Sequence, residues 1–158
     1  MNEGRKGKIL YLVVPCYNEE EIIFSSIEKL TVKMMQLIAT KRISMKSKIV
    51  FVNDGSKDKT LEILHKEAKK NAMMSVISFS TNFGHQSAIL AGMLSSANHA
   101  DMVITIDADL QQDIEALDEF ITCYENGCEV VYGVRTDRNS DSFFKKVTER
   151  RIINYFIG

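Results

Sequence analysis

Two aspartates separated by one residue, Asp107 and Asp109, are the sharpest chemical feature of the sequence. They follow the apolar run 102–106, and residues i and i+2 of an extended segment point to the same side. Two carboxylates on one side repel each other unless a cation or hydrogen-bond donors lie between them. Mg²⁺ or Mn²⁺ prefers oxygen ligands, and Gln111 offers another carbonyl oxygen. The pattern indicates a divalent-metal site for a diphosphate, unless both aspartates merely cap the next helix and its turn.

Polar and turn-forming residues also follow three other apolar runs. Residues 15–19 follow the first run, 53–56 the second and 81–85 the third. In open parallel sheets, ligands bind beyond the carboxyl ends of the strands, so four such ends predict a binding site at one edge. Asp54 is well placed there to accept hydrogen bonds from a ribose hydroxyl or a base N–H. The local alternative is an Asx turn with Ser56 as the cap of the next helix.

The elements that must position these residues alternate regularly along the chain. Short, β-branched apolar runs begin 26 to 39 residues apart, which leaves room for a helix between each pair; they start near Ile9, Lys48, Val76, Met102 and Glu129. Most of these runs are continuously apolar, a pattern typical of strands covered on both faces. The sequence therefore predicts an α/β fold, a Rossmann-like, mainly parallel sheet flanked by helices on both faces.

The composition is that of a folded domain. Of 158 residues, 45% are hydrophobic and 26% are charged, with one proline and eight glycines. This mixture excludes disordered, collagen-like and low-complexity classes, and the length fits one domain over residues 1–158. A net charge of −1 gives no bulk attraction for nucleic acid, so we expect no nucleic-acid partner. Three cysteines without a C-x-x-C pattern indicate free thiols in a reducing, cytoplasmic compartment.

Taken in order, five motifs resemble those of the inverting family 2 glycosyltransferases of GT-A fold. They are 13–20 (VVPCYNEE), 52–56 (VNDGS), 82–86 (NFGHQ), 91–92 (AG) and 107–111 (DADLQ). Within the family the likeness is nearest to the dolichyl-phosphate mannose synthase and bactoprenol glucosyltransferase branch. In that branch N-F-G and D-A-D-L-Q recur with a later Gly-x-Arg, which stands here at residues 133–135. The resemblance spans about residues 9–156.

The resemblance implies a role for each matching residue. Asp109 and Gln111 would hold the metal at the diphosphate, and the catalytic residues would be Asp109, Asp107 and Arg135. A guanidinium can clamp two phosphate oxygens, which suits Arg135. The nucleotide-sugar pocket would be lined by Pro15, Tyr17, Asn18, Glu19, Val52, Asp54, Asn82, Gly84, Asp107, Ala108 and Arg135.

The activity implied by the resemblance is a metal-dependent glycosyl transfer. A sugar would pass, with inversion, from a nucleoside-diphosphate sugar to a polyprenyl phosphate in cell-envelope glycan synthesis, with Mg²⁺ or Mn²⁺ as the cofactor. One alternative is a saccharide or protein acceptor, and another is a chain that binds only nucleotide and metal. A homo-oligomer is left open.

The last residues bear on the acceptor side. Relatives in this branch continue beyond residue 158, so we expect 1–158 to be an N-terminal fragment that lacks acceptor-side and membrane segments. Asp137 and Asp141 are the available carboxylates for a catalytic base. Residues 143–156 mix apolar and basic side chains, which fits a helix on an anionic membrane surface or one packed on the sheet. No apolar run approaches the roughly 18 residues of a membrane span, so we expect a cytoplasmic domain whose full-length form is anchored to the cytoplasmic membrane face.

Overall fold

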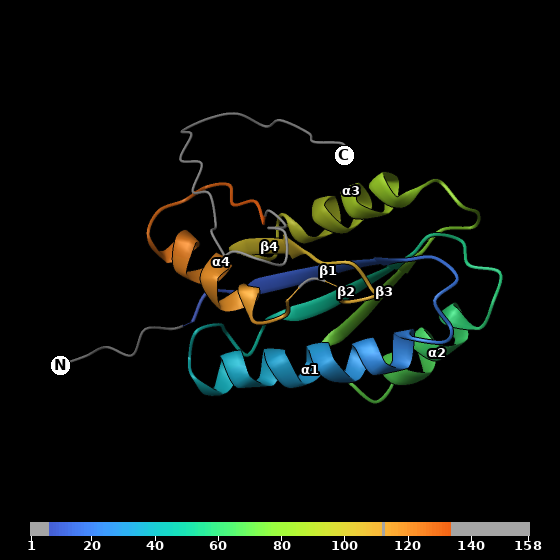
Figure 1. Cartoon of the computed structure of the whole chain (residues 1–158), viewed down its shortest axis with the longest axis horizontal. Coiled ribbons are helices and arrows are strands. Elements are labelled where there is room, and N and C mark those ends of the chain that lie inside the picture. The colour runs from blue at the N-terminus through green and yellow to red at the C-terminus, as the bar shows by residue number, and fades with distance from the viewer. Residues whose placement is uncertain (1–6, 112, 134–158) are drawn as a thin grey trace, which may run out of the picture. The chain divides into compact units, whose positions relative to one another are not determined.

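The computed structural model describes residues 7–111 and 113–133, in which strands and helices alternate strictly (Figure 1). In chain order the elements are β1 (Leu10–Cys16), α1 (Ile23–Ala39), β2 (Lys48–Asn53), α2 (Thr60–Ala68), β3 (Met74–Ser78), α3 (His85–Ser96), β4 (Met102–Thr105) and α4 (Ala116–Glu125). The chain divides into two compact units, Met1–Ile114 and Glu115–Gly158, and the first contains the whole sheet.

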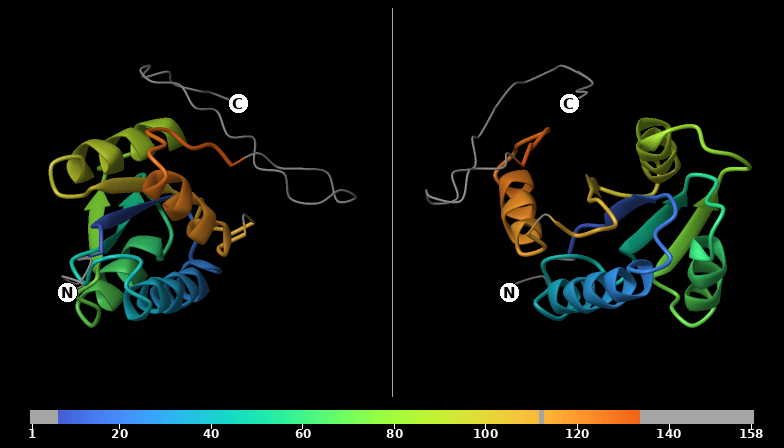
Figure 2. Two further views of the ribbon diagram at one scale, coloured as in Figure 1. Left: turned by 90° about the vertical axis from the view of Figure 1, so that its left-hand side faces the viewer. Right: turned by 45° about the vertical axis from the view of Figure 1, so that its right-hand side comes forward.

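The four strands form one parallel sheet in the order β3-β2-β1-β4. In its register, Val13 of β1 lies between Val50 of β2 and Thr105 of β4. Helices α1 and α2 cover one face and α3 covers the other, as Figures 1 and 2 show. Along the chain, β2 and β3 are added on one side of β1 and β4 on the other, so the order of the strands reverses between β1 and β4. Ligands of doubly wound sheets bind beyond the carboxyl ends of the strands at such a switch point. The predicted parallel α/β fold is confirmed.

The core lies on both faces of β1 and β2. Val13, Val50, Val52 and Ala88 of α3 form one buried cluster on the α3 face. Helix α1 packs its apolar face on the opposite side of the sheet, and the buried apolar side chains of this face are those of Ile23, Ile27, Leu30, Met34 and Leu37. Because helices cover both faces, nearly every residue of β1 and β2 is buried, which explains their continuous apolar runs.

Two expectations about the elements differ from the structure. β3 begins at Met74, two residues before the expected start. The fifth strand expected from Glu129 is wrong, because residues 129–133 pair with no strand of the described ranges. An apolar, β-branched run becomes a strand only when a neighbour accepts and donates the backbone hydrogen bonds of the ladder.

The expectation that Ser56 caps the second helix is also wrong. α2 begins at Thr60, and the Ser56 hydroxyl instead accepts a hydrogen bond from the Asn18 N–H at 3.0 Å. The carboxylate of Asp58 accepts the Thr60 N–H at 2.9 Å and satisfies the first backbone donor of the helix. A partner 38 residues away in the sequence thus takes the hydroxyl, which no local pattern reveals.

Gly92 lets α3 approach the sheet closely. A Cβ at this position would lie 2.3 Å from Cγ1 of Val13 and 3.0 Å from Cγ2 of Val52. Both valines are fully buried and β-branched, so their methyl groups have little room to rotate away. The missing side chain therefore sets the spacing between α3 and the sheet.

We predict that Gly92→Ala destabilises the fold. In an exposed helix this change would stabilise by about 1 kcal/mol, whereas overpacking a core costs about 1–3 kcal/mol. We therefore expect a lower free energy of unfolding in urea. Ser95→Ala, at an exposed position of the same helix, is the control and should shift the value by less than about 0.5 kcal/mol. A gain in stability for Gly92→Ala would contradict the close approach.

Candidate functional site

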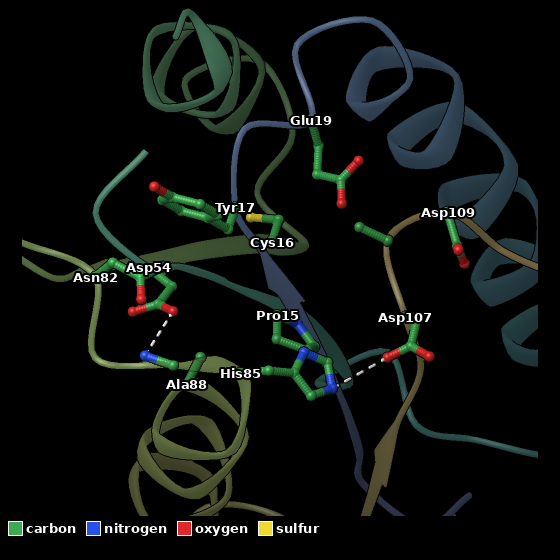
Figure 3. Close-up of a pocket in the computed structure, with 12 residues that line it drawn as sticks. Pro15, Cys16, Tyr17, Glu19, Asp54, Asn82, His85, Ala88, Asp107 and Asp109 are labelled. Carbon is green, nitrogen blue, oxygen red and sulfur yellow. Dashed lines mark hydrogen bonds and ion pairs between the residues drawn. The ribbon is translucent and has the colours of Figure 1, made fainter. Parts of the chain in front are cut away.

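A pocket of about 380 Å³ opens where the carboxyl ends of the strands meet (Figure 3). It is lined by Pro15, Cys16, Tyr17, Glu19, Asp54, Asn82, Gly84, His85, Ala88, Asp107, Ala108 and Asp109. These residues come from the end of β1, from the segments that follow β1, β2, β3 and β4, and from the first turn of α3, so all four predicted strand ends contribute. The lining includes the ends of β1 and β4, between which the strand order reverses.

Most of the predicted site residues lie in this pocket, but a few do not. Val52 is fully buried within β2, and neither Asn18 nor Gln111 belongs to the lining, although each is close in sequence to residues that do. Arg135 lies outside the described residues. The same holds for Asp137, Asp141 and 143–156, and no helix in the described ranges is long and apolar enough to cross a bilayer.

The loop after β1 is held against the loop after β2 by reciprocal hydrogen bonds. The Asn18 N–H donates to Ser56 Oγ at 3.0 Å, and Asn18 Oδ1 accepts the Lys57 N–H at 2.8 Å. The next N–H, of Glu19, donates to Thr60 Oγ1 at 2.8 Å. Asn18 adopts a φ of +53°, which an asparagine tolerates better than most residues. This clasp fixes the backbone on both sides of Asn18, and both of its neighbours line the pocket.

Asp54 holds the turn that precedes α3. Its side chain is buried, and its two oxygens accept the N–H groups of Phe83 at 2.7 Å and Gly84 at 2.9 Å. Gly84 has a φ of +94°, a conformation that favours glycine, and as the N-cap of α3 it lies directly at the pocket. A carboxylate has about four acceptor sites, so Asp54 can hold this turn and still accept hydrogen bonds from a ligand.

The segment with the two central aspartates is a turn rather than an extended strand. β4 ends at Thr105, and the last sheet bond runs from the Ile106 N–H to the Val13 carbonyl at 3.0 Å. The Leu110 N–H then donates to the Asp107 carbonyl at 3.1 Å, with Leu110 at a φ of +50°. The expectation that Asp107 and Asp109 point to one side because they continue an extended strand is therefore wrong. Both aspartates nevertheless line the same pocket.

The alternative interpretation of these aspartates as helix caps is only partly supported. Oδ1 of Asp109 accepts the Gln111 N–H at 3.1 Å, which is an Asx turn. However, α4 begins only at Ala116, with Glu115 in the cap position, so neither aspartate caps that helix.

His85, Cys16 and Ala88 line the pocket although the sequence-based set of site residues omits them. His85 is the first residue of α3, and its Nε2 lies 3.4 Å from Oδ1 of Asp107 (Figure 3). Its place directly after Gly84 in the third polar segment was the available signal. Cys16 and Ala88 carry no chemical signal of their own, because their types are those of ordinary core residues.

The pocket is strongly acidic. Glu19, Asp54, Asp107 and Asp109 line it, and its lining within the described residues includes no lysine or arginine. Burial raises the pKa of the Glu19 carboxyl above its usual value, and the charges of Asp109 and Asp58 raise it further. A cation beside Glu19 would relieve this repulsion, because a nearby positive charge favours the ionised form of a carboxyl group.

The donor set fits a divalent cation that is shared with a ligand. Within the described residues, no group of three or more His, Cys, Asp or Glu side chains is arranged to enclose a metal ion. Mg²⁺ in proteins is usually held by one or two carboxylates together with substrate phosphates and water. The carboxylate of Asp109 and the side-chain oxygen of Gln111 are hard ligands of this kind.

The thiol of Cys16 is kept neutral at the base of the pocket. It donates to the Val52 carbonyl at 3.6 Å. Burial raises its pKa to about 12, and the negative charges of Glu19, Asp58 and Asp54 add to the shift. The side chain is therefore a small, uncharged contact surface rather than a nucleophile.

Comparison with known proteins shows extensive similarity to glycosyltransferases. The family model described as "Glycosyl transferase family 2" matches residues 11–158. The uncharacterized glycosyltransferase YkoT of Bacillus subtilis is 46% identical over 89% of this chain and 42% of its own length. The bactoprenol glucosyl transferase of Shigella phage SfV is 38% identical over 87% of this chain and 42% of its own. The undecaprenyl-phosphate 4-deoxy-4-formamido-L-arabinose transferase of Photorhabdus laumondii is 36% identical over 95% and 43%.

The chain thus spans less than half the length of these relatives. Among solved structures, the mannosyltransferase PcManGT from Pyrobaculum calidifontis, in complex with GDP-Man and Mn²⁺, has a TM-score of 0.55 at 18% identity. That likeness covers 65% of this chain and 28% of PcManGT. TarS 1–349 of S. aureus has a TM-score of 0.51 at 22% identity, over 75% of this chain and 32% of TarS. At these identities the likeness shows the fold, which is the predicted GT-A fold.

We predict that Cys16 resists alkylation while the chain is folded. Because the thiolate is the nucleophile, a pKa of about 12 leaves almost no reactive form at pH 8. Mass spectrometry after iodoacetamide treatment at pH 8 should find Cys16 unmodified in the folded chain. The same treatment in urea is the control and should modify it completely. Equal rates in the two samples would contradict the burial of this thiol.

Proposed function

The chain belongs to glycosyl transferase family 2, and from that premise we propose that it binds the donor in the transfer of a sugar from a nucleoside-diphosphate sugar to a polyprenyl phosphate. The observation that carries the proposal is the acidic pocket at the switch point, which joins Asp107 and Asp109 to the start of α3. Its volume of about 380 Å³ lies in the range of roughly 300–1,000 Å³ that is usual for small-molecule sites.

The nucleotide would occupy the side of the pocket formed by the loops after β1, β2 and β3. Tyr17, Glu19, Asp54 and Asn82 line this side. Tyr17 offers an aromatic face to a base, and the carboxylates can accept from ribose hydroxyls or base N–H groups. PcManGT, which shares the fold, is in complex with GDP-Man, and this supports a nucleotide-sugar as the donor.

The diphosphate would lie near the start of α3. Gly84 and His85 line the pocket there, at the helix end that carries the positive end of the macrodipole. Asp109 and Gln111 would hold Mg²⁺ or Mn²⁺ together with the diphosphate, and Mn²⁺ in the PcManGT complex supports this cofactor. When bound, such a cation neutralises the charge that develops on a departing diphosphate. Arg135, outside the described residues, is proposed as a further phosphate ligand.

The acceptor proposal rests on relatives whose names refer to bactoprenol and undecaprenyl phosphate. A phosphate oxygen of the acceptor would attack the anomeric carbon in line, the bond to the donor diphosphate would break, and the configuration would invert. Because the acceptor is already an anion, this route needs no general base. The reaction would take place at the cytoplasmic face of a membrane, where the lipid phosphate is accessible.

Acceptor choice is tested by transfer of a radiolabelled sugar. The chain, and any longer natural protein that contains it, is supplied with extracted polyprenyl phosphate or with soluble saccharides. Label in the organic phase supports the lipid acceptor. Label only in soluble saccharides would contradict the lipid acceptor and support a saccharide acceptor. Donor binding without any transfer would support the alternative that the chain binds only nucleotide and metal.

We predict that Asp109→Asn abolishes metal-dependent nucleotide binding without unfolding the chain. Loss of a direct ligand should weaken binding by more than the roughly 10- to 100-fold that loss of an outer-shell partner costs. Calorimetric titration with GDP and UDP, each with and without Mn²⁺, measures the effect. Asp101→Asn is the matched control. Asp101 lies at the amino ends of the strands, away from the pocket, and its carboxylate accepts the Ile9 N–H, a bond that an asparagine oxygen can also accept. Unchanged Mn²⁺-dependent binding in Asp109→Asn would contradict the assignment.

A further inference from the structure

A serine stands among the apolar residues on the buried face of α1. Ser26 is 4% exposed, and its neighbours on this face are Ile23, Ile27 and Leu30. Its hydroxyl lies 2.6 Å from the carbonyl oxygen of Ala108, which is 82 residues later in the chain. It also lies 3.2 Å from the Ile22 carbonyl of its own helix, but one proton serves one good bond, and the shorter contact has the better distance.

The Ala108 carbonyl needs such a partner because the sheet has already ended. The ladder between β1 and β4 stops at the bond from the Ile106 N–H to the Val13 carbonyl. Beyond it, Ala108 is 3% exposed, too buried for its backbone groups to rely on bulk water. The hydroxyl of Ser26 supplies the hydrogen bond that a neighbouring strand would otherwise have given.

We propose that Ser26 is a positioning residue for the two carboxylates of the pocket, because it anchors the peptide between Asp107 and Asp109 to α1. This inference rests on the proposed function, in which Asp109 helps to hold a divalent cation with the donor diphosphate. Helix α1 has 17 residues and is fixed in the core, so the hydroxyl is a rigid point of attachment. A carboxylate ligand binds best when the groups around it are already held in place.

The structure also accounts for the rest of this turn. The Leu110 N–H donates to the Asp107 carbonyl, and the Gln111 N–H donates to Oδ1 of Asp109. These bonds hold the turn together internally, whereas the Ser26 bond attaches it to a separate element of the fold. His85 of α3, 3.4 Å from Oδ1 of Asp107, also contacts the turn, but through an exposed side chain rather than the backbone. Without the Ser26 bond the peptide between the two aspartates loses its attachment to α1, and the carboxylates on either side of it are held less firmly.

The test compares Ser26→Ala with Ser47→Ala. Ser47 is 1% exposed, and its Oγ accepts the Leu10 N–H at 3.0 Å at the start of β1, far along the sheet from the pocket. Both variants therefore leave one buried backbone group without its serine partner, and Ser47→Ala controls for general loss of stability. Each variant is measured by thermal unfolding, by Mn²⁺-dependent GDP and UDP titration, and by amide hydrogen exchange without metal or nucleotide.

In Ser26→Ala we expect the Mn²⁺-dependent nucleotide affinity to fall by about tenfold or more, and the amides of Leu110 and Gln111 to exchange faster. In Ser47→Ala we expect both to match the unmodified chain, whatever its melting temperature. Equal affinity and exchange in the two variants would overturn the positioning role. If the unmodified chain binds neither nucleotide, the proposed function fails, and the exchange of the Leu110 and Gln111 amides alone decides whether Ser26 anchors the turn.

Discussion

Asp54 is a buried carboxylate at the end of β2 whose two oxygens accept the backbone N–H groups of Phe83 and Gly84. Buried carboxyl oxygens are tolerated only when hydrogen bonds replace their hydration, so Asp54 depends on these two N–H donors. The same bonds hold the backbone of Phe83 and Gly84 in place. Because the bonds join the end of β2 to the start of α3, they direct the first turn of that helix at the pocket. The close approach of α3 at Gly92 then fixes the remainder of the helix against the sheet.

The parallel order of the strands brings the loops to one edge, and side-chain bonds to backbone groups then give each loop its shape. The loop after β1 is clasped by residues of the β2–α2 connection, among them Ser56 and Thr60. The turn after β4 is closed internally and attached to α1 through Ser26. The result is a preformed, acidic pocket in which like charges face one another, and a divalent cation together with a diphosphate suits such an environment.

The sequence predicted the sheet and the edge of the site for a clear physical reason. Continuous apolar runs at regular intervals require strands covered on both faces, and polar residues after four such runs must then meet at one edge. The same reasoning could not predict partners distant in sequence. Ser56 has the residue type of a helix cap but bonds to Asn18, and Ser26 lies on a helix face whose apolar pattern gives no sign of the Ala108 carbonyl opposite it. The run after residue 128 has the composition of a strand but no neighbour in the described ranges with which to pair.

Each role proposed for the pocket residues requires that this pocket bind a divalent cation together with a nucleoside diphosphate. Paramagnetic broadening by Mn²⁺ tests it most directly, with amide NMR signals of the chain recorded in the presence of GDP and of UDP. We expect Mn²⁺ with one of these nucleotides to broaden the signals of Glu19, Asp109 and Gln111 first. The signals of Met45 and Asp101, which lie before β2 and β4 at the amino ends of the strands, should remain sharp. Broadening centred on Met45 and Asp101, or no broadening with either nucleotide, would mean that the pocket does not bind the cation and the nucleotide.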